Sequence, residues 1–352
     1  MADSLSPYAN LYDNPSGPGD QRPTALQVVE DNGAAGTWSG RVVLVTGGTA
    51  GLGVETVRAM HSTGADVYFT ARSPEKAAAT KADILKTTSG TGKLEVVEMD
   101  MDSLDSVREA AAAFLNKSSS KLNVLINNAG KFSLSTSPPP PGIMACPHSS
   151  TKDGFERQFA VNHLAHYLLT RLLLPALLGT ATPGFGSRVV NVSSSAHRMA
   201  PVNLDDYNLD NKYDPWLAYA QSKTANIWTA SYIDRTLGSR GVHALSLHPG
   251  GILTGLQAYT PAEMLDAWKQ DADANSQMMS PPQGAATSVW AAVGTVWEGK
   301  GGKYLANCSV PGYSDSATSL LDIRAAPHTY DAQGEDRLWE LSAKLVAVDK
   351  DV

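Results

Sequence analysis

Short apolar runs alternate with longer amphipathic segments along most of this chain, from Trp38 onward. The runs are rich in β-branched residues and have few polar interruptions, which predicts strands that are buried on both faces. When helices separate such strands, the strands form a parallel sheet with helices on both sides. We therefore expect an α/β fold with a doubly wound parallel sheet. The expected strands are Val42–Val45, Asp66–Thr70, Leu94–Met99, Val124–Asn127, Arg188–Val192, His243–His248 and Gly302–Leu305.

Helical periodicity fills most of the intervals between these runs. In a sheet of this kind, ligands bind beyond the carboxyl ends of the strands. The residues that directly follow each strand are therefore the first candidates for a functional site. The expected helices are Leu52–Thr63, Leu104–Leu115, Gly154–Leu178 and Trp216–Leu237.

A glycine-rich turn, Thr46-Gly47-Gly48-Thr49-Ala50-Gly51-Leu52-Gly53, follows the first strand and leads into a helix. Glycines allow a tight turn and a close approach of the backbone to a phosphate, and the helix N-terminus supplies unpaired N–H groups. The spacing of Gly47, Gly51 and Gly53 differs from the G-x-G-x-x-G pattern of the commoner dinucleotide fold. A turn used only for packing is the alternative. The position after a strand favours a dinucleotide phosphate site.

Tyr219 and Lys223 stand four residues apart in an Ala-rich stretch without Gly or Pro, from Trp216 to Asn226. If that stretch is helical, the phenol and the ammonium share one face. A nearby cation favours the phenolate and lowers the pKa of a tyrosine from about 10, which makes the phenol useful in proton transfer. Most such pairs lie on solvated helix faces, so the surrounding motifs must decide between the two interpretations.

Three motifs in chain order carry a resemblance: Thr-Gly-x-x-x-Gly-x-Gly, then Asn127-Asn128-Ala129-Gly130, then the Tyr219/Lys223 pair. Together they resemble the short-chain dehydrogenase/reductase family, over about residues 39–346. Within it the chain is most similar to the retinol-dehydrogenase-like branch and to fungal members of secondary metabolism. The resemblance implies a seven-stranded Rossmann-type sheet and hydride transfer with a nicotinamide cofactor. The segments that support the branch are residues 153–156, 158–159, 161–164, 188–194, 282–286 and 338–341.

The same resemblance assigns catalytic roles. It makes Ser194 the serine that orients the substrate carbonyl, Tyr219 the proton donor, and Lys223 the cation that lowers the tyrosine pKa and binds the nicotinamide ribose. Asn162 resembles the asparagine that holds a water in a proton relay to the lysine. The cofactor-binding residues that the motifs imply are Thr46, Gly47, Gly51, Leu52, Gly53, Asp100, Met101, Asn128, Ala129, Gly130, Tyr219, Lys223, Pro249, Gly250, Ile252 and Thr254.

The end of the second strand bears on cofactor choice. An acid there accepts a hydrogen bond from the adenosine ribose, whereas an arginine pairs with a 2′-phosphate. Ala71 stands where NAD-preferring relatives carry the acid, and Arg72 follows it. We therefore expect NADP(H), with Arg72 as an ordinary solvated residue at a helix start as the alternative.

These assignments predict an NADP(H)-dependent oxidoreductase that reduces the ketone or aldehyde of a bulky lipophilic or aromatic small molecule in a biosynthetic pathway. The apolar residues of a segment at about 255–280 predict a substrate lid. The Pro-rich insertion at 131–142 is either a wall of the site or a solvent loop. Two alternatives remain open: a non-redox isomerase or dehydratase on the same site, and a non-catalytic NADP(H)-binding regulator.

Domain organisation and setting follow from composition. Residues 1–37 are rich in Pro, Gly, Asp, Asn and Ser, which predicts a flexible or surface-draped extension before a single domain at 38–352. The net charge of −7 argues against a nucleic-acid partner or an anionic membrane surface. We see neither a secretory signal nor a membrane anchor, and the two distant cysteines suit a reducing compartment, so we expect a cytoplasmic protein.

Two further interpretations concern the long helical segment. His163 and His166 lie three residues apart but have no third ligand at a suitable spacing, so we expect packing histidines and no metal site. Family members often dimerise through the helices that carry Asn162 and Tyr219. The leucines from Leu168 to Leu173 suit either a homodimer interface or the core.

Overall fold

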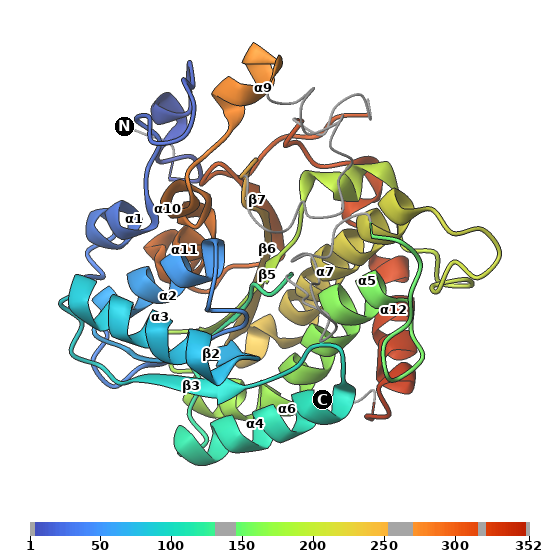
Figure 1. The fold of residues 1–352 in the computed structure, drawn as a ribbon, viewed down its shortest axis with the longest axis horizontal. Helices are drawn as coiled ribbons and strands as arrows, with labels where there is room; N and C mark the ends of the chain where they lie inside the picture. Colours follow the sequence, from blue (N-terminus) through green and yellow to red (C-terminus); the bar gives the residue numbers. More distant parts are fainter. Residues whose placement is uncertain (1–3, 131–145, 253–269, 316–321, 350–352) are drawn as a thin grey trace.

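The computed structural model describes residues 4–130, 146–252, 270–315 and 322–349 (Figure 1). Within these ranges, seven strands form one sheet in the order β3-β2-β1-β4-β5-β6-β7, and each neighbouring pair is parallel. The predicted doubly wound α/β fold is confirmed. The strands are β1 (Val42–Val45), β2 (Asp66–Ala71), β3 (Leu94–Glu98), β4 (Val124–Asn127), β5 (Ser187–Val192), β6 (Val242–His248) and β7 (Lys303–Ala306).

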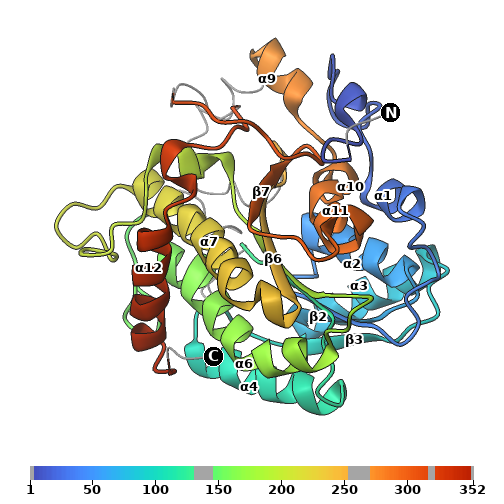
Figure 2. The ribbon, with the colours of Figure 1, turned by 180° about the vertical axis from the view of Figure 1, so that it is seen from behind.

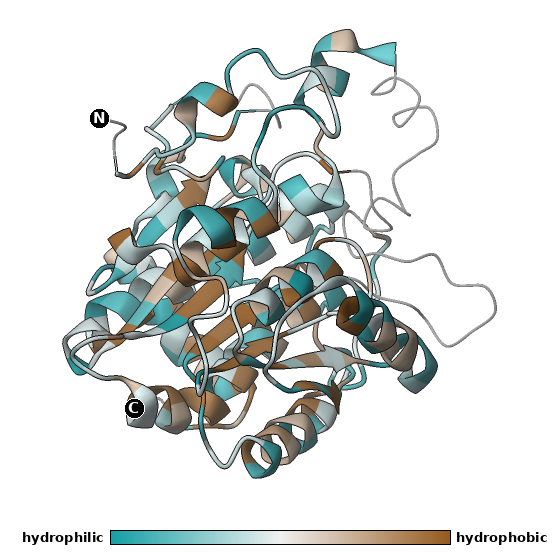
Figure 3. Cartoon of the chain, turned by 90° about the vertical axis from the view of Figure 1, so that its left-hand side faces the viewer, coloured by the Kyte–Doolittle hydropathy of each residue, from teal (hydrophilic) through white to brown (hydrophobic). Residues whose placement is uncertain are grey.

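The central strands are apolar because both of their faces are covered. Val42 and Leu44 of β1 pack in the hydrophobic cluster on one side of the sheet, and Val43 and Val45 pack in the cluster on the other side. This alternation is the period of two that a strand imposes on its side chains. Figure 3 shows hydrophobic residues concentrated in the strands and on the inward faces of the helices.

Helices cover both faces of the sheet (Figures 1 and 2). On one face lie α2 (Leu52–Ser62), α3 (Pro74–Thr87) and α11 (Ala286–Val293). On the other lie α4 (Leu104–Lys117), α6 (Ala165–Thr180) and α7 (Pro215–Leu237). Between them, these helices bury the side chains of both sheet faces. No helix among the described residues is long and apolar enough to cross a membrane.

The helix expected at Gly154–Leu178 is interrupted, which corrects the prediction. It consists of α5 (Arg157–Phe159), a π-helical turn η2 (Ala160–Leu164) and then α6. It also begins later than predicted, because the Glu156 carboxylate accepts the backbone N–H groups of Gln158 and Phe159 and so caps α5. A π turn adds one residue to a helical turn, often at a functional site, and here it contains Asn162.

Residues 4–37 are packed against the domain, not merely draped over it. They contain a short 3₁₀ turn η1 (Ala9–Leu11) and α1 (Ala25–Asp31), which lies beside α2 and α11 (Figure 1). Val28 and Val29 are fully buried, in the same cluster as the side chains of α11. The boundary expected near residue 37 therefore does not separate an extension from the core. The average composition of the segment is polar, so it did not predict the short helix α1, whose apolar residues are buried.

The C-terminal third of the chain contributes helices to both faces of the sheet. The structure describes α9 (Ala272–Gln277), α10 (Pro281–Gly284) and α12 (Ala332–Leu345) there. On α12, Trp339 stacks on Tyr232 at 4.3 Å between ring centroids and meets Tyr167 edge-on at 4.8 Å. Since α12 lies against α7 and contacts α6, Leu168 and its neighbours on α6 face the core of this chain. The remaining short 3₁₀ turns are η3 (Ser195–Met199), η4 (Gly238–Arg240), η6 (Thr295–Trp297) and η7 (Pro327–Thr329).

Two predicted features lie outside the described residues. One is the Pro-rich insertion at 131–142, and the other is the part of the expected lid up to residue 269. The lid interval that is described contains α9 and the segment that leads from it to Ser280.

Candidate active site

The glycine turn after β1 closes tightly on itself. Gly47 and Gly51 have φ values of 70° and 54°, which favour glycine. A Cβ atom on Gly53 would lie 2.1 Å from the carbonyl oxygen of Gly47, so this position requires glycine as well. The helix α2 then starts at Leu52, and its N-cap Gly51 offers no side-chain hydrogen bond. The N–H groups of the first turn of α2 are thus left for an anion.

Two neighbouring strands hold this turn. Thr46 Oγ1 accepts hydrogen bonds from the backbone N–H groups of Asn128 and Ala129, each at 2.9 Å. On the other side, the N–H of Gly47 donates to Thr70 Oγ1 at 3.0 Å, near the end of β2. The structure therefore brings the turn, the Asn127–Gly130 motif and the end of β2 to one edge of the sheet.

His166 joins this turn to Asn162, a link that the sequence reasoning missed. Its Nε2 lies 2.9 Å from Thr46 Oγ1 and its Nδ1 lies 3.0 Å from the carbonyl oxygen of Asn162. Because two N–H groups already occupy the lone pairs of Thr46 Oγ1, the hydroxyl donates to Nε2. Nδ1 then carries the proton and donates to Asn162. Burial lowers the pKa of His166 to about 4, so the ring is neutral at pH 7.

Tyr219 and Lys223 lie on the inner side of α7. The helix begins at Pro215 with Asp214 as its N-cap, which fixes the start of the segment. Both side chains are buried, and Lys223 Nζ lies 5.6 Å from the centre of the Tyr219 ring. Nζ also donates to the carbonyl oxygen of Val192 at 3.2 Å. The phenol and the ammonium therefore share one face, directly against the end of β5.

The expected lowering of the tyrosine pKa is not what the structure shows. Burial raises the pKa of Tyr219 to about 12, and a hydrogen bond from Ser194 opposes this only in part. Burial also lowers the pKa of Lys223 to about 8. The reason is that the site removes both groups from water, which disfavours the charged form of each. At neutral pH the phenol therefore holds its proton firmly.

Ser194 is the serine of its run that reaches Tyr219. It lies directly after β5, in extended backbone, and caps η3 by accepting from the N–H of Ala196 at 3.2 Å. The flanking serines are engaged elsewhere: Ser193 Oγ donates to the carbonyl oxygen of Lys223, and the N–H of Ser195 donates to Nδ1 of His248. Ser194 and Tyr219 thus place two hydroxyl groups side by side.

Asn162 lies behind this pair, on the π turn. Its Nδ2 donates to Ser222 Oγ at 3.0 Å, whereas its buried Oδ1 has no hydrogen-bond partner within the described part of the chain. A buried acceptor without a partner is costly, so it calls for a donor such as a water molecule. This is the environment that a proton relay needs.

A row of buried asparagines supports the ends of β4 and β5, and the sequence reasoning did not foresee it. Asn127 Nδ2 donates to Asn191 Oδ1 at 2.9 Å, and Asn191 Nδ2 donates to the carbonyl oxygen of Asn226 at 3.0 Å. Asn226 Nδ2 returns to the carbonyl oxygen of Val192, which also accepts from Lys223. These bonds fix the height of β5 relative to α7. The available signal was an asparagine within each of two apolar strands.

The turn after β6 forms a third side of the site. Gly250 has a φ of 105°, and Ile252 is buried. The carbonyl oxygen of Gly251 accepts the N–H of Met279 at 2.8 Å, so the segment after α9 runs beside this turn. Thr254, predicted to contact the cofactor, lies outside the described residues.

The remaining predicted residues lie at the ends of β2 and β3. Arg72 is exposed and follows Ala71, the last residue of β2. The N–H of Asp100 donates to Ser106 Oγ at 2.9 Å, and Met101 is buried beside it in the core. Of these two strand ends, that of β2 reaches the glycine turn, since Thr70 contacts Gly47.

The chemistry of this edge fits a nicotinamide dinucleotide. A glycine-rich turn precedes the N-terminus of α2, which has no side-chain cap, and this suits a pyrophosphate. A buried cation and an unpartnered buried amide oxygen lie at the other end, beside two hydroxyl groups. Among the described residues, no group of three His, Cys, Asp or Glu side chains is arranged to hold a metal ion.

Comparisons with known proteins agree with this geometry. The family model for short chain dehydrogenases matches residues 41–264. The short-chain dehydrogenase/reductase prx1 of Penicillium roqueforti is 45% identical over 339 residues, covering 96% of this chain and 94% of that protein. The oxidoreductase calI of Penicillium decumbens is 40% identical over 356 residues, covering 99% of each.

More distant relatives extend the match. Human retinol dehydrogenase 11 is 34% identical, covering 88% of this chain and 86% of that protein. The crystal structure of an uncharacterized Mycobacterium paratuberculosis protein, 31% identical, superposes with a TM-score of 0.65 and covers 91% of this chain and 98% of that one. A short chain dehydrogenase from Burkholderia cenocepacia, solved in complex with NADP, is 25% identical with a TM-score of 0.56, covering 77% of this chain and 97% of that one. The chain belongs to the short-chain dehydrogenase/reductase family, in the retinol-dehydrogenase-like branch with fungal members such as prx1 and calI.

Proposed function

We propose that this protein is an NADP(H)-dependent reductase that converts a ketone or aldehyde into the corresponding alcohol. The observation that carries the proposal is the pairing of the Ser194 and Tyr219 hydroxyls, with Lys223 against the same ring, at the edge of the sheet that holds the glycine turn. Two hydroxyl donors suit one carbonyl oxygen. We propose the same catalytic set that the sequence predicts: Ser194, Tyr219, Lys223 and Asn162.

The choice of NADP(H) rests on the end of β2. That strand ends at Ala71, beside the glycine turn, and offers no carboxylate to repel a 2′-phosphate. Arg72 follows as a cation that pairs with such a phosphate. The Burkholderia relative that binds NADP supports the same choice.

The proton chemistry follows from the environment of each hydroxyl. When bound, the nicotinamide supplies the hydride. Ser194 and Tyr219 donate hydrogen bonds to the substrate oxygen, and Tyr219 transfers its proton as negative charge develops there. Because burial raises the pKa of Tyr219 to about 12, the phenol is fully protonated before the reaction, as a general acid must be.

Lys223 and Asn162 serve the tyrosine after that transfer. The phenolate left behind lies close to the Lys223 ammonium in a site of low polarity, where their attraction is strong. A water held by Asn162 Oδ1 would return a proton to this centre. Oxidation of the alcohol is the same path in reverse, and a reduced NADP pool favours reduction.

We infer a bulky lipophilic or aromatic substrate. Ile252, Met278 and Met279 line the described side of the turn after β6, and methionines adapt well to irregular apolar ligands. Similarity to prx1 and calI over nearly the whole chain supports the predicted role in a biosynthetic pathway.

The test is an absorbance assay with NADPH and a panel of carbonyl compounds. We expect NADPH oxidation with bulky lipophilic or aromatic members, and a loss of at least about a thousandfold in kcat for Tyr219→Phe with cofactor binding retained. Equal activity of this variant would overturn the assignment. Substrate conversion without any absorbance change would support an isomerase or dehydratase, and NADPH binding without any conversion would support a regulator.

A further inference from the structure

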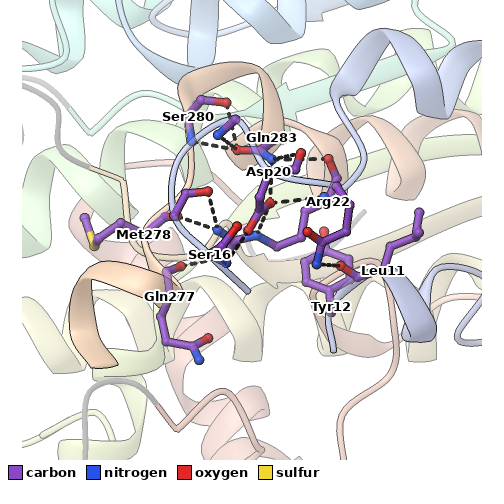
Figure 4. A network of polar contacts seen from close by, with 12 residues as sticks. Leu11, Tyr12, Ser16, Asp20, Arg22, Gln277, Met278, Ser280 and Gln283 are labelled. Atoms are coloured by element: carbon purple, nitrogen blue, oxygen red, sulfur yellow. Dashed lines mark hydrogen bonds and ion pairs between the residues drawn. The ribbon is translucent and has the colours of Figure 1, made fainter. Parts of the chain in front are cut away.

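A buried polar network ties the N-terminal segment to the segment after α9 (Figure 4). Its centre is Arg22, which is 3% exposed and donates from Nε to Asp20 Oδ1 at 2.8 Å. Its two Nη atoms donate to the backbone carbonyls of Ser276, Gln277 and Met278. One guanidinium therefore holds the last turn of α9 and the first residue beyond it.

Gln283 on α10 completes the network. Its Nε2 donates to Asp20 Oδ1 at 3.0 Å and to the carbonyl oxygen of Arg22 at 3.2 Å. Its Oε1 accepts the N–H groups of Gly19 and Ser280. Because Gln283 is 1% exposed, all these bonds form away from water, where an unmade one is costly.

On their other side, α10 and the residues between α9 and α10 contact the candidate cofactor site. A Cβ atom on Gly284 would lie 2.6 Å from Ile252 Cδ1 and 2.7 Å from Leu52 Cδ2, so α10 packs directly on the turn after β6 and on the start of α2. The N–H of Met279 donates to the carbonyl oxygen of Gly251. A displacement of α10 or of Met279 would therefore move both walls of the site.

We propose that the N-terminal segment is a functional part of the cofactor site, with Arg22 as a positioning residue that holds Met279 and α10 against the Pro249–Ile252 turn. The inference rests on the proposed function for the identity of the cofactor. Neither Arg22 nor Asp20 touches the reacting groups: both act through Gln283, Gly284 and Met279. The segment thus contributes to dinucleotide affinity from the far side of α10.

The test uses the full chain with Arg22→Met, which keeps the aliphatic stem and removes the five donors. Asp20→Asn is a milder second variant that keeps the side-chain volume, and Arg22→Lys tests rescue by charge alone. Arg337→Met is the matched control, because Arg337 forms an exposed ion pair with Asp205 at 3.1 Å, far from the site. Two readouts are measured: hydrogen–deuterium exchange of the cofactor-free protein, and the Kd for NADPH by fluorescence titration.

We expect Arg22→Met to speed exchange in peptides covering residues 249–252 and 278–285 and to raise the Kd for NADPH about tenfold, with kcat at saturating NADPH within about twofold. Asp20→Asn should shift both readouts in the same direction by less, Arg22→Lys should restore them only in part, and Arg337→Met should change neither. A loss of thermal stability alone, with unchanged Kd and unchanged exchange at 249–252, would show a merely structural role and overturn the inference.

The two proposals fail in distinguishable ways. If the wild-type protein binds no NADPH, the proposed function fails, and the exchange measurement alone then decides whether Arg22 holds the turn. If the wild-type protein binds NADPH and Arg22→Met binds it equally well, the positioning role fails and the proposed function stands. If Arg22→Met does not fold, the same two measurements on Asp20→Asn, hydrogen–deuterium exchange and the Kd for NADPH, decide between these outcomes.

Discussion

Two buried polar systems lie on either side of α10, and they differ in how fully their atoms are paired. In the N-terminal network, the guanidinium of Arg22, the carboxylate of Asp20 and the amide of Gln283 use each of their polar atoms in described bonds. At the proposed catalytic centre, Asn162 Oδ1 has no partner within the described residues, and burial pushes Tyr219 and Lys223 toward their neutral forms.

This difference in hydrogen bonding suits the first system to holding a structure and the second to performing a reaction. A saturated network has a single arrangement and resists change, because each broken bond leaves a buried group unpaired. Groups that are buried but incompletely paired have shifted pKa values and spare capacity for a ligand, which is typical of active sites. Substitutions in the first system should therefore affect stability and, through α10, cofactor affinity, whereas substitutions in the second should affect turnover.

The largest effect should come from Lys223→Met. We expect kcat to fall by about 10²–10⁴ because the cation beside Tyr219 is lost. The free energy of unfolding should stay the same or rise, by about 1–3 kcal/mol, because methionine occupies the space without a buried charge. Steady-state kinetics and urea unfolding at pH 7 measure the two quantities. A variant that is both active and unstable would reverse the comparison.

Mild acid should destabilise the region around α6 and β6 before the N-terminal network. Burial lowers the pKa of His166 and His248 to about 4 and that of His163 to about 3. Below pH 6.5 these histidines are protonated in the unfolded chain but stay neutral in the folded chain. The free energy of unfolding therefore falls as pH falls, by up to about 2 kcal/mol per histidine at pH 5.

Asp20 also stabilises the fold less as pH falls, but only in a lower pH range. Burial disfavours its charge, but hydrogen bonds from Arg22 and Ser16 outweigh that effect and lower its pKa to about 2. The ionised Asp20 carboxylate stabilises the fold fully above its ordinary pKa of 3.8, and this stabilisation is lost as pH falls from there through about 2. It is therefore intact at pH 5. Between pH 7 and 5, protection from hydrogen exchange, corrected for the intrinsic exchange rate at each pH, should fall in peptides of α6 and β6 before it falls in peptides covering residues 16–24. The reverse order would contradict this assignment of the two systems.

A smaller effect is expected from Gln283→Ala. Removing this amide takes the acceptor from the N–H groups of Gly19 and Ser280 and the donor from the buried carbonyl oxygen of Arg22, which should cost about 2–4 kcal/mol of unfolding free energy. At saturating cofactor, kcat should change by less than about twofold. Chemical denaturation and kinetics at high NADPH decide the matter, and a loss of kcat without a loss of stability would refute the structural role.

The smallest effect is expected at His166, which joins Thr46 of the glycine turn to Asn162. His166→Leu removes the link from Thr46 to Asn162 and should lower kcat/KM about fivefold, or about 1 kcal/mol. His163→Leu is the matched control, because His163 faces Ser342 on α12 and not the site. It should cost similar stability with unchanged kcat/KM. Equal kinetic effects of the two variants would show that His166 is only a packing residue.

Local patterns were enough to predict the sheet. Val42–Val45 and Val124–Asn127 are strands with the predicted bounds, because a buried central strand is apolar throughout and ends where polar or Gly residues begin. The roles proposed for Ser194, Tyr219 and Lys223 came instead from the resemblance of their motifs to the family. The structure places these residues together, as the motif order implied.

Other features depend on contacts between residues far apart in sequence. The partners of Arg22 lie on α9 and α10, near the other end of the chain, so no window of sequence shows them. The sign of the Tyr219 pKa shift depends on how much water the fold removes, which the spacing to Lys223 does not contain. The π turn at Asn162 escapes a periodicity search because it changes the helical repeat for a single turn.

The position of α12 has a consequence for how this molecule is made in the cell. During synthesis, α6 and α7 leave the ribosome long before Trp339, which later covers Tyr167 and Tyr232. Until then these helices expose an aromatic surface that favours aggregation. The hydrogen bonds of Asp20 and Arg22 with Gln283 likewise form only after Gln283 has been synthesised. The contact between α7 and α12 is thus completed late, and a chaperone that shields nascent chains should bind this protein between the synthesis of α7 and that of α12.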